Sequence, residues 1–164
     1  MTTYQYPSPA WLEASAKIYH SSSKFENELK KVTTRLYLRI KSEPAWGIDG
    51  DMIFGAVVEK GVLKEMGFCN EEEAKSKAEF ILTATPQEWK KILTKESKFL
   101  TDFMLGKIQL EQGSKVGMLG IAPYANLFVE ALTQVELKFP DEMTPQEREA
   151  FCNELAKIRI EQGI

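Results

Sequence analysis

The fold is encoded most clearly in residues 79–113, which read EFILTATPQEWKKILTKESKFLTDFMLGKIQLEQG. Residues 79–84 form a nearly continuous apolar run, which is typical of a strand inside a sheet. A helix start follows at once, because Thr85 can cap the helix, Pro86 suits its first turn and Glu88 completes a capping box. One face of this predicted helix carries Trp89, Ile92 and Leu93.

A second short helix and a further strand complete this stretch. The helix carries four bulky apolar residues: Phe99, Leu100, Phe103 and Met104. Gly106 can end it in the left-handed conformation. Residues 107–111 then alternate between polar and apolar, the period of a strand with one covered face, and Gln112 and Gly113 predict a turn.

The segment before this stretch predicts helices and then antiparallel strands. Ser8 can cap a helix in which Trp11, Ile18, Phe25 and Val32 recur every seventh residue. Residues 21–23 are all serine, so that two short helices and one bent helix both remain open. Residues 34–40 alternate as a half-buried strand, with Arg35, Tyr37 and Arg39 expected to face solvent.

Two turns predict a meander of strands in the middle of the chain. Asp49-Gly50 separates residues 45–48 from 52–58, and Lys60-Gly61 precedes a strand over 62–66. Residues 70–78 are charged and predict either a short helix or a polar crossover.

Helices are predicted at the C-terminal end. Pro123 can open one whose stripe is Tyr124, Leu127, Phe128, Ala131, Leu132 and Val135. The last, from Thr144, begins with another capping box, spans about residues 145–161 and is expected to bury Phe151, Leu155 and Ile158. The order predicts an α+β fold: a mostly antiparallel sheet of about five strands with helices packed on one face. We divide the chain into a helical lead-in, residues 1–33, and a domain over 34–164.

Charge and composition narrow the class of function. The net charge of -3 argues against a nucleic-acid footprint, which needs a concentrated positive field. No apolar run approaches the roughly 20 residues that span a bilayer, and the first residues lack the features of a secretory signal, so a cytoplasmic protein is expected. Cys69 and Cys152 lack metal-ligand spacing and are expected to be free thiols, with a disulfide between them as the alternative.

The sequence offers no convincing catalytic constellation. His20 has no nearby Asp, Ser or Cys partner, and no serine lies in a GxSxG-type elbow. Residues 113–117 are too short for a phosphate loop. Residues 71–73 are three glutamates, best interpreted as a solvated charge run. We therefore expect neither an enzyme nor a bound metal or cofactor.

The central stretch resembles the sterol carrier protein type 2 domain. The resemblance lies in the strand ending at residues 82–85, the helix with Gln87-Glu88-Trp89, and the run from Phe103 to Gly113, in which phenylalanine, methionine, glycine and lysine end a helix before an alternating strand and a glycine turn. It covers about a third of the chain. The resemblance implies a sheet and covering helices that enclose an apolar tunnel for a sterol, fatty acid, fatty acyl-CoA or phospholipid.

The expected function is binding, and transfer, of such a hydrophobic ligand. The ligand-binding residues expected in the tunnel, of which Phe103 and Met104 lie in the matching motif, are Trp89, Ile92, Leu93, Phe99, Phe103, Met104, Ile108, Leu110, Met118, Leu127, Phe128 and Leu132. Transient membrane contact and a homodimer are both compatible with this role. Two alternatives stay open: an interaction or dimerisation module whose cavity is filled, and a non-catalytic accessory domain that acts with an acyl-lipid enzyme.

Overall fold

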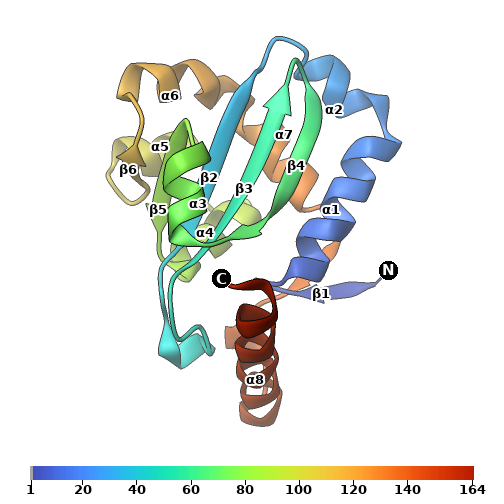
Figure 1. The fold of residues 1–164 in the computed structure, drawn as a ribbon, viewed down its shortest axis with the longest axis vertical. Helices are drawn as coiled ribbons and strands as arrows, with labels where there is room; N and C mark the ends of the chain where they lie inside the picture. Colours follow the sequence, from blue (N-terminus) through green and yellow to red (C-terminus); the bar gives the residue numbers. More distant parts are fainter. Residues whose placement is uncertain (1) are drawn as a thin grey trace.

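Five strands form the central sheet of the protein in a computed structural model that describes residues 2–164 (Figure 1). In spatial order they are β4 (Val62–Cys69), β3 (Met52–Glu59), β2 (Thr34–Ile40), β5 (Phe80–Ala84) and β6 (Gln109–Gln112). Only β2 and β5 run parallel, and the other three neighbouring pairs are antiparallel. The predicted fold class, α+β with a mostly antiparallel sheet, is confirmed.

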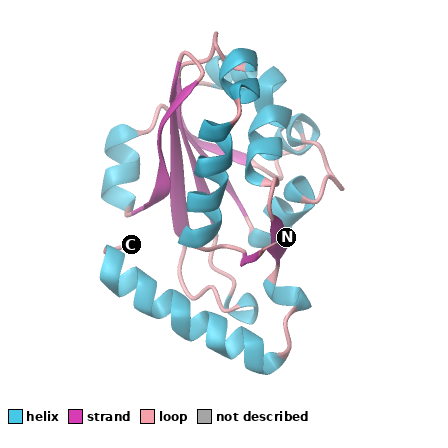
Figure 2. Ribbon diagram, turned by 90° about the vertical axis from the view of Figure 1, so that its right-hand side faces the viewer, coloured by secondary structure: helices cyan, strands magenta, loops and turns pink. Residues whose placement is uncertain are grey.

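The helices cover the two faces of the sheet unequally (Figure 2). One face is covered by α1 (Pro9–Ser21), α2 (Ser23–Glu28), α4 (Pro86–Leu93), α5 (Phe99–Met104), α6 (Lys115–Ile121) and α7 (Ala125–Leu132). The opposite face carries α3 (Glu71–Lys77), whose Ala74 is fully buried against Tyr37, Ile53 and Ile81. The main core therefore lies between the sheet and the larger helical layer.

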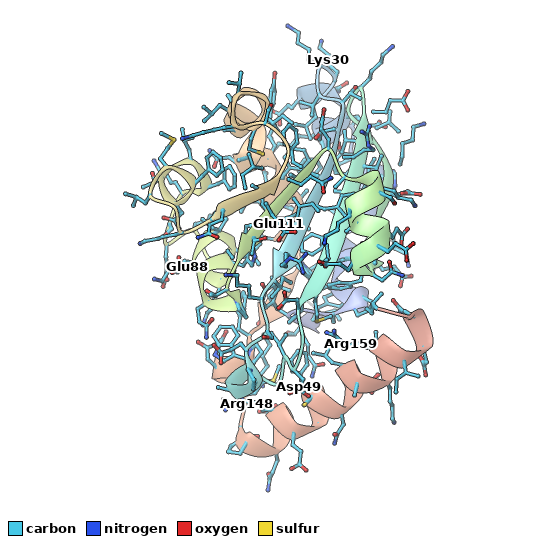
Figure 3. The ribbon with its side chains drawn as sticks, turned by 60° about the vertical axis from the view of Figure 1, so that its left-hand side comes forward. Lys30, Asp49, Glu88, Glu111, Arg148 and Arg159 are labelled. Atoms are coloured by element: carbon cyan, nitrogen blue, oxygen red, sulfur yellow. The ribbon has the colours of Figure 1, made fainter. Side chains whose placement is uncertain are left out.

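The last helix, α8 (Pro145–Gln162), lies across one end of the sheet (Figures 1 and 2). It buries Phe151 and Leu155, whereas Ile158, which was expected to be buried, is half-exposed. Arg159 fastens the helix to the loop before β3 by donating hydrogen bonds to the carbonyls of Gly50 and Asp51, both at 3.1 Å (Figure 3).

Most of the helix starts predicted from the sequence are confirmed by their caps. The hydroxyls of Ser8, Thr85 and Thr144 each accept a hydrogen bond from a backbone amide three residues ahead. At Thr144 the carboxylate of Glu147 returns the bond, which completes the capping box. At Thr85 the box is only half formed, because Glu88 returns no bond and its Oε2 is buried with no partner among residues 2–164.

The run of serines separates two helices rather than bending one. Ser22 has an extended backbone, and its hydroxyl accepts a bond from the amide of Lys24, so it caps α2 directly after α1 ends. Both helices then pack on the β3–β4 hairpin. The hydroxyl of Tyr19 donates to the carbonyl of Gly61 in the hairpin turn, at 2.6 Å. Gly61 has a φ of 83°, and a Cβ there would lie 2.4 Å from the carbonyl of Glu26, so only glycine fits.

The prediction that three residues of β2 face solvent is wrong for two of them. Tyr37 and Arg39 are 3% and 8% exposed, and only Arg35 faces solvent. The reason is α3, which covers this side of the sheet, and the acidic groups that surround the Arg39 guanidinium. Alternation alone cannot tell a solvated face from one covered by a single short helix.

Other differences concern short segments. Residues 45–48 do not form a strand; Pro44–Trp46 is a 3-10 turn. Pro123 does not open a helix but lies in a second 3-10 turn, Ala122–Tyr124, between α6 and α7. A third such turn, Pro140–Glu142, precedes α8. A parallel pair of three-residue strands, β1 (Thr3–Gln5) and β7 (Glu136–Lys138), was not predicted, because three residues are too few to show a period.

Two further findings concern the chain as a whole. Cys69 and Cys152 are both free thiols. Within residues 2–164, the helices are all too short or too polar to cross a membrane.

Candidate ligand cavity

A cavity of about 70 Å³ lies between the sheet and the larger helical layer. Its lining residues are Tyr6, Trp11, Tyr19, Leu36, Leu38, Phe54, Ala56, Leu63, Met66, Leu82, Trp89, Ile92, Leu93, Phe99, Met118, Ile121, Ala125, Phe128, Val129, Ala131 and Leu132. None of these residues is charged, and every atom that faces the space is apolar. A water molecule there would find no hydrogen-bond partner, so the space suits an apolar occupant.

The floor of the cavity comes from one face of four strands. Leu36 on β2 pairs with Ala56 on β3, and Leu38 pairs with Phe54. On the other side of β2, Leu38 also pairs with Leu82 on β5. Because side chains two residues apart share a face, these pairs form one continuous apolar surface. The apolar positions of β2, Leu36 and Leu38, thus form part of the cavity floor. Neither residue is among the expected ligand-binding residues.

The roof of the cavity comes from helices and the connections between them. Its bulky residues include Trp11 on α1, Trp89 on α4, Phe99 on α5, Met118 on α6 and Phe128 on α7. α7 lies centrally, since it contacts α1, α4 and α5. Except for α1, each of these helices has eight residues or fewer.

The polar ends of the aromatic lining residues are directed away from the cavity. The indole Nε1 of Trp11 donates to the carbonyl of Leu132 at 2.8 Å, and that of Trp89 donates to the carbonyl of Arg39 at 3.0 Å. The hydroxyl of Tyr19 is bonded to Gly61, and burial, together with nearby Glu26, raises the pKa of Tyr19 to about 12. These bonds leave only ring carbons for the cavity wall.

Tyr6 differs from Trp11, Trp89 and Tyr19 because no hydrogen-bond partner is described for its polar end. Its ring packs edge-on against Trp11, with ring centroids 5.3 Å apart, and it also contacts Phe139. The residue is 1% exposed, and its hydroxyl has no hydrogen-bond partner among the described residues. Burial raises the pKa of Tyr6 far above its usual value, so the hydroxyl stays neutral.

The structure brings together seven of the twelve residues expected to bind ligand. The seven that line the cavity are Trp89, Ile92, Leu93, Phe99, Met118, Phe128 and Leu132. The other five lie outside its wall. Phe103 and Ile108 are buried in the surrounding core, Phe103 stacking on Phe99 with centroids 5.7 Å apart. Leu110 and Leu127 are half-buried, and Met104 is 59% exposed.

The expected ligand-binding residues do not include the lining residues of the strands and of α1, nor four on α6 and α7: Ile121, Ala125, Val129 and Ala131. The alternation in β2 and the seven-residue period through Trp11 predict a strand and a helix, but neither pattern indicates that these residues face a cavity. The side chains of Tyr6 and Met66 gave no signal. Tyr6 lies in the connection between β1 and α1, and Met66 lies on an edge strand whose exposure varies from residue to residue.

A cluster of charges lies on the other face of the sheet, away from the cavity. The Arg39 guanidinium donates two hydrogen bonds to Glu111, at 2.8 and 2.9 Å, and one each to Glu71 and Asp51. Figure 3 shows Glu111 over the sheet, on the side that carries α3. Hydrogen bonding to Arg39 lowers the pKa of Glu111 and of Glu71. Thr83 adds a further bond to Glu111 at 2.8 Å.

These groups form an ion-pair network centred on Arg39, whose acidic partners are partly exposed. Nearby Cys69 is buried, and burial raises the pKa of its thiol to about 11, the opposite of what a reactive thiolate needs. Across residues 2–164 the His, Cys, Asp and Glu side chains form no group of three or more that could hold a metal ion.

Solved structures of known proteins share the fold of this chain. No protein-family model and no curated protein matches the chain. Among solved structures, a crystal structure of sterol carrier protein 2 is similar to it with a TM-score of 0.67 and 17% identity, covering 78% of this chain and 97% of that one. A solution structure of a conserved hypothetical protein from Thermus thermophilus, described as possibly sterol carrier protein, also gives 0.67, with 19% identity and coverage of 80% and 90%. The apo form of sterol carrier protein 2 from Yarrowia lipolytica gives 0.54, with 11% identity and coverage of 76% and 88%. The chain therefore has the fold of sterol carrier protein 2, as the resemblance of residues 79–113 predicted.

Proposed function

We propose that the protein is a non-catalytic carrier that holds the apolar part of a lipid between the sheet and helices α1 and α4–α7. The observation that carries this proposal is the cavity, whose wall is apolar throughout while the polar ends of Trp11, Trp89 and Tyr19 are bonded elsewhere. The fold shared with sterol carrier protein 2 supports the same role.

The apolar wall restricts which part of a lipid enters. A charged head group would lose its hydration without gaining a partner, which costs several kcal/mol or more for an ion. Each buried methylene, in contrast, contributes about 0.8 kcal/mol. A sterol ring system or the acyl chain of a fatty acid, fatty acyl-CoA or phospholipid therefore occupies the cavity, and any charged head group stays at its edge.

The cavity must expand to accept such a ligand. Its volume of about 70 Å³ is several times smaller than the roughly 300–1,000 Å³ of typical ligand pockets. The strands of the floor are fixed by their hydrogen bonds, so the short helices of the roof must supply the movement. Expansion on binding is thus part of the proposal.

A variant that fills the cavity tests the proposal. Ala131 on α7 is buried and faces the space, and leucine is only slightly less favourable than alanine in a helix. We expect Ala131→Leu to fold normally and to bind an intrinsically fluorescent polyene fatty acid at least tenfold more weakly than the unchanged chain. Binding is measured by energy transfer from the tryptophans, two of which line the cavity. Ala150→Leu, on the exposed side of α8, is the matched control and should bind normally.

The results separate this function from its alternatives. Equal binding by Ala131→Leu and the unchanged chain would place the fatty acid elsewhere and contradict the proposal. A chain that binds no fatty acid but forms a dimer at rising concentration would favour the interaction module. Turnover of a fatty acyl-CoA by the purified protein would favour an enzyme.

A further inference from the structure

The exposed apolar side chains of the protein are concentrated on one side. Seven large hydrophobic residues are clearly exposed among residues 2–164, and five of them lie between positions 100 and 119: Leu100, Met104, Leu105, Val116 and Leu119. These five belong to α5, to the turn after it and to α6, which lie on the same side of the molecule beside β6 (Figures 1 and 3). We call them the α5–α6 face.

This face is the outer surface of the cavity roof. On α5, Phe99 lines the cavity while the next residue, Leu100, is 47% exposed. On α6, Met118 lines the cavity while Val116 is 83% exposed. Both helices are thus apolar on two sides. The inner side is explained by the core, whereas the outer side has no partner within residues 2–164 and is typical of a contact surface.

Lysines surround the α5–α6 face. Lys98 precedes α5, Lys107 follows its terminal turn and Lys115 begins α6, and all three are exposed. None of them takes part in the ion pairs found among residues 2–164. The acidic groups of this segment offset them only in part. Asp102 is buried and Glu111 is engaged by Arg39, which leaves exposed Glu96.

We propose that the α5–α6 face docks on a bilayer that contains anionic lipids. Exposed aliphatic residues can enter the boundary between head groups and acyl chains, and each lysine near the surface gains about 1 kcal/mol from anionic head groups. The local positive charge is notable in a chain whose net charge is -3, since the chain as a whole would be repelled. Docking in this orientation sets the thin helical wall of the cavity against the membrane. The purpose of the contact, exchange of a lipid, rests on the proposed carrier function.

Vesicle binding tests the apolar part of this proposal. The full chain is mixed with vesicles of phosphatidylcholine, with and without phosphatidylserine, and the bound fraction is measured by flotation. Val116→Asp should lower binding to the phosphatidylserine vesicles about tenfold. Aspartate suits the first turn of α6, so the helix is retained. Ile160→Asp on α8 is the matched control, because Ile160 is 84% exposed and lies off the α5–α6 face.

A second pair of variants tests the charge. Lys107→Glu should lower binding about fivefold or more, and added salt should reduce the difference. Lys64→Glu, an exposed lysine of β4 that forms none of the described ion pairs, should have little effect. Fatty-acid uptake from solution, measured without vesicles, should be normal in all four variants. If the unchanged chain takes up no fatty acid, the carrier function is contradicted. If it takes up fatty acid but does not bind the vesicles, only the docking surface is contradicted.

Three results would overturn the docking proposal. The first is equal binding to vesicles with and without phosphatidylserine. The second is an equal loss of binding in Val116→Asp and Ile160→Asp. The third is a dimer that Val116→Asp dissociates, together with no vesicle binding, which would identify the occupant of the face as a second copy of the chain.

Discussion

Two tyrosines in the cavity wall differ in the hydrogen bonding of their hydroxyl groups. Tyr6 and Tyr19 are both 1% exposed, but the hydroxyl of Tyr19 donates to Gly61 at 2.6 Å and that of Tyr6 has no described partner. We expect Tyr19→Phe to lower the free energy of unfolding by about 1 kcal/mol, and Tyr6→Phe to leave it unchanged or raise it by about the same amount. Urea denaturation of both variants measures this. A clear loss of stability in Tyr6→Phe would mean that its hydroxyl has a partner, such as a bound water.

Arg39 is the residue whose charge organises the opposite face of the sheet. Arg39→Met should lower the free energy of unfolding by about 2 kcal/mol at neutral pH, less than for a fully buried pair because the acidic partners are 32–49% exposed. Lys75→Met, which removes an exposed partner of Glu71, should cost far less.

The same network makes the free energy of unfolding depend on pH. Hydrogen bonding to Arg39 lowers the pKa of Glu71 and Glu111 in the folded state. Their contribution to stability is therefore fully present above the unfolded value of about 4.3, and it is lost as pH falls through the lower folded values. We expect the unchanged chain to lose more stability than Arg39→Met as the pH is lowered from about 5 to 3. Parallel curves for the two proteins, measured by denaturation at each pH, would contradict this account.

At the scale of elements, we infer that α5 is held less firmly than its neighbour α4 in the cavity roof. It has six residues, and its N-cap Lys98 supplies no side-chain hydrogen bond. Its buried Asp102 has an Oδ2 with no partner in the described part of the chain. The neighbouring α4 begins with a capping threonine and a proline. We expect the amides of α5 to exchange hydrogen faster than those of α4, and a bound fatty acid to slow exchange in α5. Equal protection in the free protein, measured by mass spectrometry, would contradict a mobile roof.

Elements with local signals were predictable from the sequence. Caps at Ser8, Thr85 and Thr144 and the alternation over 34–40 depend on neighbouring residues, and each predicted its element. α6 was missed because two glycines, Gly117 and Gly120, leave it no apolar stripe, although Ser114 caps it. The burial of Tyr37 and Arg39 depends on where α3 packs, and no local pattern contains that information. For the same reason the cavity residues on helices were easier to predict than those on strands.

At the scale of the whole molecule, the helical layer is apolar on both its inner and its outer surface. Its inner surface meets the sheet around an apolar space, and its outer surface at α5 and α6 is apolar and bordered by lysines. The proposed carrier function depends on whether this layer separates from the sheet to accept a lipid. We expect the ion-pair network and α3, on the far side of the sheet, to take no part in that movement, so they provide an internal reference.

A fatty-acid titration followed by the methyl resonances of the protein tests this central claim most directly. The methyls of Leu36, Leu82 and Leu132 line the cavity, whereas those of Ile53 and Ile81 are buried under α3. We expect large, saturable shifts in the first group and small ones in the second. Shifts confined to surface residues, or none in the cavity group at saturating ligand, would contradict the carrier account.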